Sequence, residues 1–365
     1  MDTGRKQCIR EWALIVLFIG FLALPLLLFV SQSQQNGISE QEKRVVAAAP
    51  KFTLPRFFSD AYQKEYEQYF NDHFGLRNKL VTANGALHYY ALATSPNDKV
   101  LIGNDHWLFY SAEQTIERYK SGNVLSAQEL ASIAQLLQDE QRLLIERGIQ
   151  FIVLVAPDKE TIYPEQMPRR IKPSANPSTL DSFLNAMKDT NVTVIDPRSA
   201  LQAQARLQKL YTETDTHWTD RGAQIAFDLV RASLSQDITD TIEYRETEFD
   251  KGDLANLISL GGRLHESIPE AVSMQDAYNL DVTTRNGVNI RTTTTSDADE
   301  RTILVFRDSF GEKLIPFFAS SFNHATFERE YFDGTVIDEL QPDVVVLQIV
   351  ERNIVRLTEG REAHP

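Results

Sequence analysis

The sequence predicts an α/β protein with a mostly parallel sheet. Four short runs are mostly apolar, which is typical of strands buried on both faces, and helical patterns lie between them. The runs are IQFIVLVAP, NVTVIDP, RTILVF and PDVVVLQIV, at residues 149–157, 191–197, 301–306 and 342–350. Because ligands bind at the carboxyl ends of the strands in such sheets, we look for functional residues directly after these runs.

The N-terminal part carries an uncharged apolar run of nineteen residues, from Trp12 to Val30. At about 1.5 Å per residue, a helix of this length just crosses a hydrocarbon core of about 30 Å. Arg5, Lys6 and Arg10 precede the run and favour a cytoplasmic N-terminus. We therefore predict a cytoplasmic segment at 1–11, a transmembrane anchor at 12–31 and an exported remainder. The alternative is a signal peptide cleaved after the small-x-small sequence Ser31-Gln32-Ser33.

The exported part is predicted to contain a polar tether and then one domain. Residues 32–50 are polar and small and form the tether, and 51–365 form the domain. Within the domain, aromatic residues at helical spacing in 57–93 predict helices broken near Gly75, with the aromatic stripe in the core.

Three further elements complete the pattern. KVLIGNDHWLFY (99–110) predicts a hairpin, and a long helix is expected from Ser126 to about Arg147, stopped at Gly148. Helices are also expected after Trp218 and over GEKLIPFFASSF (311–322).

Composition and motifs exclude several classes of function. The formal net charge of −14 argues against a nucleic-acid binder, since such proteins need basic surface to displace counterions. The single cysteine, Cys8, permits no intramolecular disulfide. The histidines lack metal-ligand spacing, and neither a P-loop nor a G-x-G-x-x-G sequence is present. We therefore expect no metal and no cofactor.

Three residues form a candidate catalytic triad. Ser309 follows the third apolar run, where a serine can point out of the sheet edge and the amides opening the next helix can support an oxyanion. His217 is the candidate base and Asp215 the carboxylate that orients it. Each has a plain structural alternative: Ser309 can cap a helix, and the Asp-x-His segment can be a helix entrance with a packed histidine.

Two other places could contribute to the site. Glu351 and Arg352 close the fourth run, and they could form a structural ion pair or contact substrate. GDLANLISLGG (252–262) could be a loop near the site or a surface turn.

Several blocks of the sequence resemble one family. The chain resembles the SGNH-hydrolase-like polysaccharide O-acetyltransferases of the AlgJ/AlgX type. The resemblance rests on DTHW (215–218) followed by RDSF (307–310), together with SPNDKVLIGNDHWLFY, APDKETIYP and ERNI. The resemblance runs from about Phe52 to about Ile354. Ordinary SGNH esterases place the serine before the histidine, so the order here resembles the permuted arrangement of the acetyltransferases.

The resemblance implies a fold, an activity and partners. The expected fold is a three-layer α/β/α SGNH-hydrolase-like domain with circularly permuted motif order. The implied function is acetyl transfer, through an acetyl-serine on Ser309, to hydroxyls of an exported, alginate-like polysaccharide in the periplasm. A membrane-bound O-acyltransferase would supply the acetyl group, other exopolysaccharide-complex subunits would be partners, and the anchor would lie in the bacterial inner membrane.

Within these blocks, Lys159, Arg307 and Arg352 are candidates for substrate contact. Arg307 stands where G-D-S enzymes have glycine, so their oxyanion assignments do not carry over. Two rival functions stay open: an acetylesterase with the same triad, and a non-catalytic scaffold or sugar-binding subunit of an acetylation complex.

Overall fold

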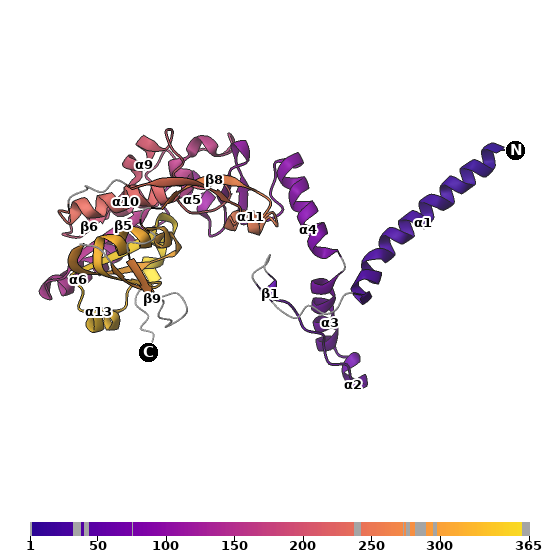
Figure 1. Cartoon of the computed structure of the whole chain (residues 1–365), viewed down its shortest axis with the longest axis horizontal. Helices are drawn as coiled ribbons and strands as arrows, with labels where there is room; N and C mark the ends of the chain where they lie inside the picture. Colours follow the sequence, from indigo (N-terminus) through magenta and orange to yellow (C-terminus); the bar gives the residue numbers. More distant parts are fainter. Residues whose placement is uncertain are drawn as a thin grey trace. The chain divides into compact units, whose positions relative to one another are not determined.

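The computed structural model describes residues 2–31, 38–39, 44–74, 76–236, 242–272, 274, 278–281, 290–294 and 298–359. The chain divides into two compact units, Met1–Pro96 with Asn256–Gly261, and Asn97–Ala255 with Gly262–Pro365 (Figure 1). The division at Pro96 falls inside the single domain that the sequence predicted for 51–365.

The first unit is largely helical. Its aromatic stripe is only partly internal, because Tyr62 and Tyr69 are buried while Tyr66 is 44% exposed. The predicted break near Gly75 falls on a residue outside the described part of the chain. Its elements are α1 (Asp2–Ser31), β1 (Ile38–Ser39), β2 (Arg44–Val45), α2 (Leu54–Phe57), α3 (Asp60–His73), α4 (Arg77–Ala86) and the π-helix η1 (Leu87–Leu92).

Helix α1 covers the segment predicted to be a membrane anchor. Among the helices that the structure describes, none has both the length and the apolar character that a membrane crossing requires. The transmembrane prediction for 12–31 is therefore not supported.

The second unit contains a seven-stranded sheet with the order β6-β5-β13-β11-β12-β10-β9. The first five of these strands pair in parallel, and β10 and β9 add antiparallel pairs at one edge. The prediction of a mostly parallel sheet is confirmed. The strands are β5 (Gln150–Ala156), β6 (Thr193–Ile195), β9 (Tyr278–Asp281), β10 (Ile290–Thr294), β11 (Asp299–Arg307), β12 (Phe322–Glu328) and β13 (Val344–Val350).

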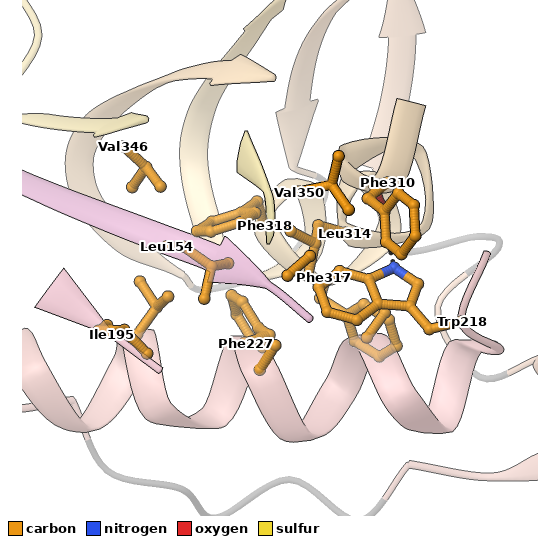
Figure 2. Packing of buried hydrophobic residues seen from close by; sticks show 14 of the residues in the cluster. Leu154, Ile195, Trp218, Phe227, Phe310, Leu314, Phe317, Phe318, Val346 and Val350 are labelled. Atoms are coloured by element: carbon orange, nitrogen blue, oxygen red, sulfur yellow. Dashed lines mark hydrogen bonds between the residues drawn. The ribbon is translucent and has the colours of Figure 1, made fainter. Parts of the chain in front are cut away.

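Helices cover both faces of this sheet. Alternate residues of each central strand enter opposite cores: Leu154 of β5 packs on one face and Val153 on the other. This explains why the central strands are mostly apolar. The first core includes Phe227, Phe317 and Trp218 (Figure 2). It is covered by α7 (Lys159–Ile162), α9 (Arg198–Gln204), α10 (Asp220–Ser233) and α12 (Ile315–Ser321), and the second core by α6 (Ala127–Glu146), α8 (Thr179–Met187) and α13 (Gly334–Leu340).

Two local predictions are confirmed in detail. The hairpin consists of β3 (Val100–Ile102) and β4 (Leu108–Tyr110), paired antiparallel. The long helix α6 begins after Ser126, which forms a capping box with Glu129, and it is followed by Gly148 at φ +75°. A glycine tolerates this left-handed conformation because it has no Cβ.

The prediction of one helix over 311–322 is wrong. The chain first forms a 3₁₀-helix, η4 (Ser309–Leu314), then α12, and Phe322 already begins the strand β12. Ser320 and Ser321 end α12, and Asn323 and His324 follow Phe322 in β12. Neither glycine nor proline separates the helix from the strand, so the sequence carries no turn signal at this boundary.

The remaining elements of the second unit are short. They are η2 (Asn104–His106), α5 (Thr115–Ser121), η3 (Pro164–Gln166), β7 (Tyr244–Phe249), α11 (Asp253–Leu257), β8 (Glu266–Ala271) and η5 (Glu351–Glu359); β7 and β8 form a separate antiparallel pair.

Candidate active site

Ser309 lies in the turn that follows β11, at the carboxyl edge of the sheet. Asp308 caps η4, since its Oδ1 accepts a hydrogen bond from the amide of Phe310 at 2.9 Å. Its other carboxylate oxygen accepts one from the amide of Val350, at the end of β13, at 2.6 Å. Gln348 donates to Asp308 at 3.0 Å and accepts from the Asp308 amide at 3.2 Å. These contacts tie the serine turn to the neighbouring strand.

Gly311 allows the turn to pack this closely. A Cβ at this position would lie 2.5 Å from the Cβ of Arg307 and 2.7 Å from Oε1 of Gln348. Both distances are shorter than van der Waals contact. The glycine is therefore required by close approach.

The amides that open η4 are engaged within the turn. The Phe310 amide donates to the Asp308 side chain, and the Gly311 amide donates to the Asp308 carbonyl at 3.3 Å. The expectation that the helix-opening amides support an oxyanion therefore does not hold for these two groups.

His217 lies in the loop before α10. Thr219 caps that helix, and its hydroxyl accepts from the Gly222 amide. The indole of Trp218 is fully buried and donates to the Phe310 carbonyl at 3.0 Å. Trp218 thus fixes the histidine loop against the serine turn, although the two lie far apart in the sequence.

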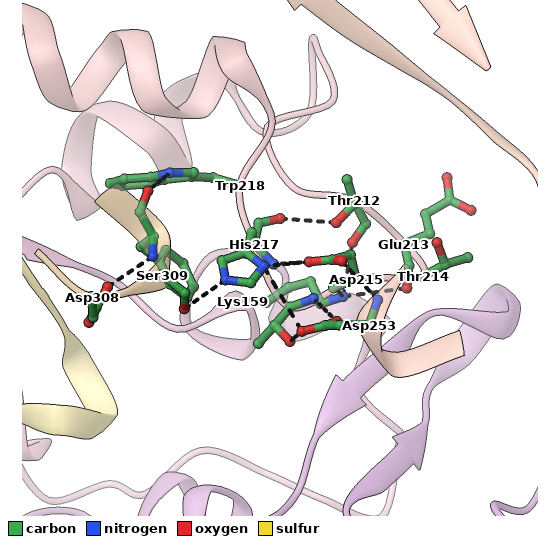
Figure 3. A network of polar contacts seen from close by, with 12 residues as sticks. Lys159, Thr212, Glu213, Thr214, Asp215, His217, Trp218, Asp253, Asp308 and Ser309 are labelled. Carbon is green, nitrogen blue, oxygen red and sulfur yellow. Dashed lines mark hydrogen bonds and ion pairs between the residues drawn. The ribbon is translucent and has the colours of Figure 1, made fainter. Parts of the chain in front are cut away.

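The structure brings Ser309, His217 and Asp215 together in one hydrogen-bonded chain (Figure 3). The His217 Nε2 to Ser309 Oγ distance is 2.9 Å. The His217 Nδ1 to Asp215 Oδ1 distance is 2.6 Å, and the same carboxylate oxygen accepts from the His217 amide at 2.9 Å. This is the order that a nucleophile, a base and an orienting carboxylate need.

The surroundings of Asp215 and His217 lower the pKa of the carboxyl group and raise the pKa of the imidazole. Burial alone would raise the pKa of Asp215, but the hydrogen bond and charge of His217, with two backbone amides, outweigh it and lower this pKa to about 2. Burial alone would lower the pKa of His217, but the hydrogen bond and charge of Asp215, followed by the charge of Asp253, raise it. Asp215 therefore stays ionised beside an imidazole of increased basicity.

Asp253 is a second carboxylate near the histidine. Its amide donates to Asp215 Oδ2 at 2.8 Å, and its carboxylate accepts from the amide of Thr216 at 2.8 Å and from the hydroxyl of the same residue. A carboxylate oxygen of Asp253 lies 4.0 Å from His217 Nδ1. Asp253 thus holds both Asp215 and the segment between the two triad residues.

The contacts of Asp253 show whether the segment 252–262 is a loop near the site or a surface turn. The segment is not only a surface turn, because α11 begins at Asp253 beside the site. Gly252 also packs against the loop, where a Cβ would lie 2.3 Å from the Thr214 carbonyl oxygen.

Two buried side chains hold the backbone of the histidine loop. Lys159 Nζ donates to the carbonyls of Thr212 at 2.9 Å and Asp215 at 2.6 Å. Glu266 accepts from the amides of Glu213 and Thr214 at 2.8 and 2.9 Å. The loop is therefore fixed from both its carbonyl and its amide sides.

This arrangement corrects the expectation that Lys159 contacts substrate. The side chain is 3% exposed, and burial lowers its pKa to about 8. Its ammonium group is engaged by loop carbonyls. Lys159 is a residue that positions the loop.

Arg307 is buried, and the side chain of Arg352 is 11% exposed. Arg307 is 2% exposed and donates to the Asp308 carbonyl at 3.2 Å, so it has no surface to offer a substrate. Arg352 forms an ion pair with Asp158, and its guanidinium lies 5.2 Å from the rings of Tyr110 and Phe310. The ion pair expected within 351–352 instead joins Arg352 to a residue that follows β5.

Asp215, His217 and Asp253 have ligand atoms within 4.8 Å of one another, which is close enough to hold a cation. The 2.6 Å between His217 Nδ1 and Asp215 is a hydrogen-bond distance, so a metal ion would have to replace this bond. The residues present fit a triad more closely than a metal centre.

Sequence reasoning missed Asp308, Glu266 and Gln348, and it included Asp253 only as part of the segment 252–262. Asp308 stands next to the serine in the quoted motif, so its position was a signal that could have been used. Asp253 and Glu266 reach the loop only through the tertiary fold.

The fold and site define an SGNH-hydrolase-like α/β protein. The model of the family described as "SGNH hydrolase-like domain, acetyltransferase AlgX" matches residues 100–318. This match covers more than half of the chain, and the chain belongs to this family.

The sequence identity to individual relatives is low. The chain is similar to the "Probable alginate O-acetylase AlgJ" of Pseudomonas aeruginosa, with 26% identity over 219 residues, which are 58% of this chain and 54% of that protein. The chain thus spans about half the length of the curated relatives it matches.

Two solved structures show the same fold. Bacillus cereus PatB1 is 19% identical with a TM-score of 0.50, over 71% of this chain and 97% of that one. A DHHW family protein of Eubacterium siraeum is 16% identical with a TM-score of 0.51, over 72% and 95%.

Proposed function

We propose that the protein is an O-acetyltransferase that moves acetyl groups to hydroxyls of an exported polysaccharide. The observation that carries the proposal is the hydrogen-bonded chain from Ser309 Oγ through His217 to Asp215, at 2.9 and 2.6 Å. Membership of an acetyltransferase family and similarity to a protein named as an alginate O-acetylase support it.

The first half-reaction loads the enzyme. Ser309 Oγ attacks the acetyl carbonyl of a donor while His217 Nε2 takes the hydroxyl proton. Asp215 holds the imidazole in the correct tautomer and stabilises the imidazolium. The bond from the acetyl carbon to the donor oxygen then breaks, and that oxygen receives the proton from His217. The product is an acetyl ester on Ser309.

The second half-reaction uses the same groups in reverse. A sugar hydroxyl attacks the acetyl-serine, and His217 removes its proton. The Ser309–acetyl bond breaks and Ser309 Oγ recovers the proton. One acetyl group has moved and no water has been consumed. An esterase would differ only in using water as the second acceptor.

The proposed partners are those that the resemblance to the acetyltransferase family implies. A membrane-bound O-acyltransferase would present the acetyl group, other exopolysaccharide-complex subunits would present the polymer, and an alginate-like polysaccharide is the proposed acceptor class.

The location of the protein is part of the proposal. Acetylation of an exported polymer requires the second unit in the periplasm, with attachment to the inner membrane through Trp12–Val30 as the sequence pattern suggests. Cell fractionation with N-terminal sequencing of the native protein tests it. A mature N-terminus near Gln34 would contradict anchoring.

The test of the function is covalent labelling. Incubation with p-nitrophenyl acetate should place an acetyl group on Ser309, found by peptide mass, and Ser309→Ala should stay unlabelled. Adding an oligosaccharide should then move the label to sugar faster than water removes it. Faster hydrolysis than transfer would favour the esterase, and an inert, correctly folded protein would favour the scaffold.

A further inference from the structure

The ring of Phe310 lies against the imidazole of His217. The centroids of the two rings are 4.8 Å apart. Phe310 directly follows Ser309 in the chain, and its side chain is fully buried. It also packs edge-on to the indole of Trp218, at 5.5 Å between centroids (Figure 2). Phe310 therefore covers one side of the proposed base, and its position determines how the imidazole is packed.

The guanidinium of Arg352 contacts the same ring. Its central carbon lies 5.2 Å from the ring centroid of Phe310 and 5.2 Å from that of Tyr110, which ends β4. A guanidinium is planar and delocalised, so it is attracted to the face of an aromatic ring and stacks on it. Arg352 therefore holds Phe310 from outside the triad, and only this one ring lies between its cation and His217.

Asp158 fixes the position of Arg352. The two side chains form an ion pair in which the side chain of Asp158 is 7% exposed and that of Arg352 is 11% exposed. Asp158 follows β5 and Arg352 follows β13, and these two strands are parallel neighbours in the sheet. The amide of Asp158 also donates to the carboxylate of Glu351 at 3.1 Å. The guanidinium is therefore anchored to the ends of two central strands.

Charges of both signs bear on the imidazole of His217. Asp215 in the same loop and Asp253 on α11 are the carboxylates, Arg352 on η5 is a cation, and Lys159 on α7 holds the Asp215 carbonyl. Burial lowers the pKa of His217, the two carboxylates raise it, and the charge of Arg352 lowers it. A general base accepts a proton only in its neutral form, so a cation here keeps the imidazole available.

We propose that Arg352 is a positioning residue for His217: its guanidinium holds Phe310 against the imidazole and offsets the negative charge of the two carboxylates beside it. This inference rests on the proposed function, in which His217 is the base of acetyl transfer. Arg352 acts through Phe310 and needs no contact with the substrate. A merely structural ion pair with Asp158 would affect the stability of the protein, but it would leave the protonation of His217 unchanged.

Nuclear magnetic resonance titration of the full-length protein with isotope-labelled histidine measures the protonation of His217 without any substrate, and His217→Ala assigns its signal. Arg352→Gln removes the cation, and its amide can still donate to Asp158, whose pKa burial already raises. Arg352→Lys keeps the cation but loses the planar guanidinium. Arg356→Gln is the matched control, because Arg356 lies on the same helix and its exposed side chain pairs with Glu113.

Arg352→Gln should raise the pKa of His217, whereas Arg352→Lys and Arg356→Gln should leave it at the wild-type value. The rate of Ser309 acetylation by p-nitrophenyl acetate, measured where the imidazole is neutral in every variant, should fall about ten- to a hundredfold in both Arg352 variants, because the ring that packs on the base is displaced. Arg356→Gln should keep the wild-type rate.

An unchanged His217 pKa in Arg352→Gln, or a wild-type rate in Arg352→Lys, would overturn the inference. Circular dichroism checks folding, and if Arg352→Gln does not fold, the rate in Arg352→Lys decides. Wild-type Ser309 that stays unlabelled would contradict the proposed function instead, and the titration, which needs no activity, would still test the role of Arg352.

Discussion

A serine hydroxyl becomes a nucleophile only through the groups around it, and Ser309 has His217 Nε2 at 2.9 Å. The triad should act as a unit, so losses of single members should resemble one another. We expect Ser309→Ala and His217→Ala each to abolish acetyl transfer, and the double variant to add little. Asp215→Asn can hold the wrong tautomer and should lower the rate by about 10⁴-fold, as in serine proteases.

The measurement is the rate of acetyl transfer from p-nitrophenyl acetate to an oligosaccharide, with circular dichroism to confirm folding. If the effects of Ser309→Ala and His217→Ala multiply in the double variant, the two residues act independently and the triad assignment fails.

Asp253 offers a test through pH. The neutral imidazole of His217 is the active base, so activity should fall as pH decreases through its pKa, which lies above the usual histidine value. Asp253 contributes to that rise through its negative charge. Asp253→Asn should therefore lower this pKa and move the acid limb of the pH–rate profile to lower pH.

Asp338→Asn, at an exposed position on α13, which packs on the second core, is the matched control and should leave the profile unchanged. An acid limb that stays in place in Asp253→Asn, with only a lower rate at every pH, would mean that Asp253 acts solely through its hydrogen bonds to the loop.

At the scale of an element, the serine turn depends on close packing. Gly311→Ala should destabilise the protein by about 1–3 kcal/mol, because its Cβ would overlap Arg307 and Gln348. For a unit of this size, about 2–4 °C in melting temperature corresponds to each kcal/mol. Gly334→Ala has no atom within 4 Å of the new Cβ and should be neutral or slightly stabilising. Equal melting temperatures for the two variants in thermal unfolding would refute the packing argument.

Elements were predictable where the sequence pattern has one structural solution. The apolar run of β5 and the Ser126 cap with Gly148 after the helix were read correctly because each follows from local chemistry. The boundary between α12 and β12 was missed, because neither glycine nor proline marks it. The predicted anchor at 12–31 is the opposite case. Its length and composition predicted a membrane-spanning helix, and the described structure does not support that prediction.

At the scale of the second unit, the parallel sheet explains why the site could be located without a structure. Ser309 directly follows β11, and His217, 92 residues earlier in the loop between α9 and α10, meets it at that edge of the sheet. The contacts that hold them, from Asp253, Glu266 and Lys159, arise only from the fold. The sequence therefore predicts which residues could react, and the tertiary contacts determine how they are held.

The charge of the whole molecule gives the last prediction. A net charge of −14 repels an anionic acceptor, and salt screens this repulsion with a Debye length of about 30 Å at 0.01 M and about 8 Å at 0.15 M. The rate of acetyl transfer to tetramannuronate, measured below saturation, should therefore rise over this range of salt, and the rate to cellotetraose should change little. A rate with tetramannuronate that falls as salt is added would mean that a local basic surface attracts the polymer despite the overall charge.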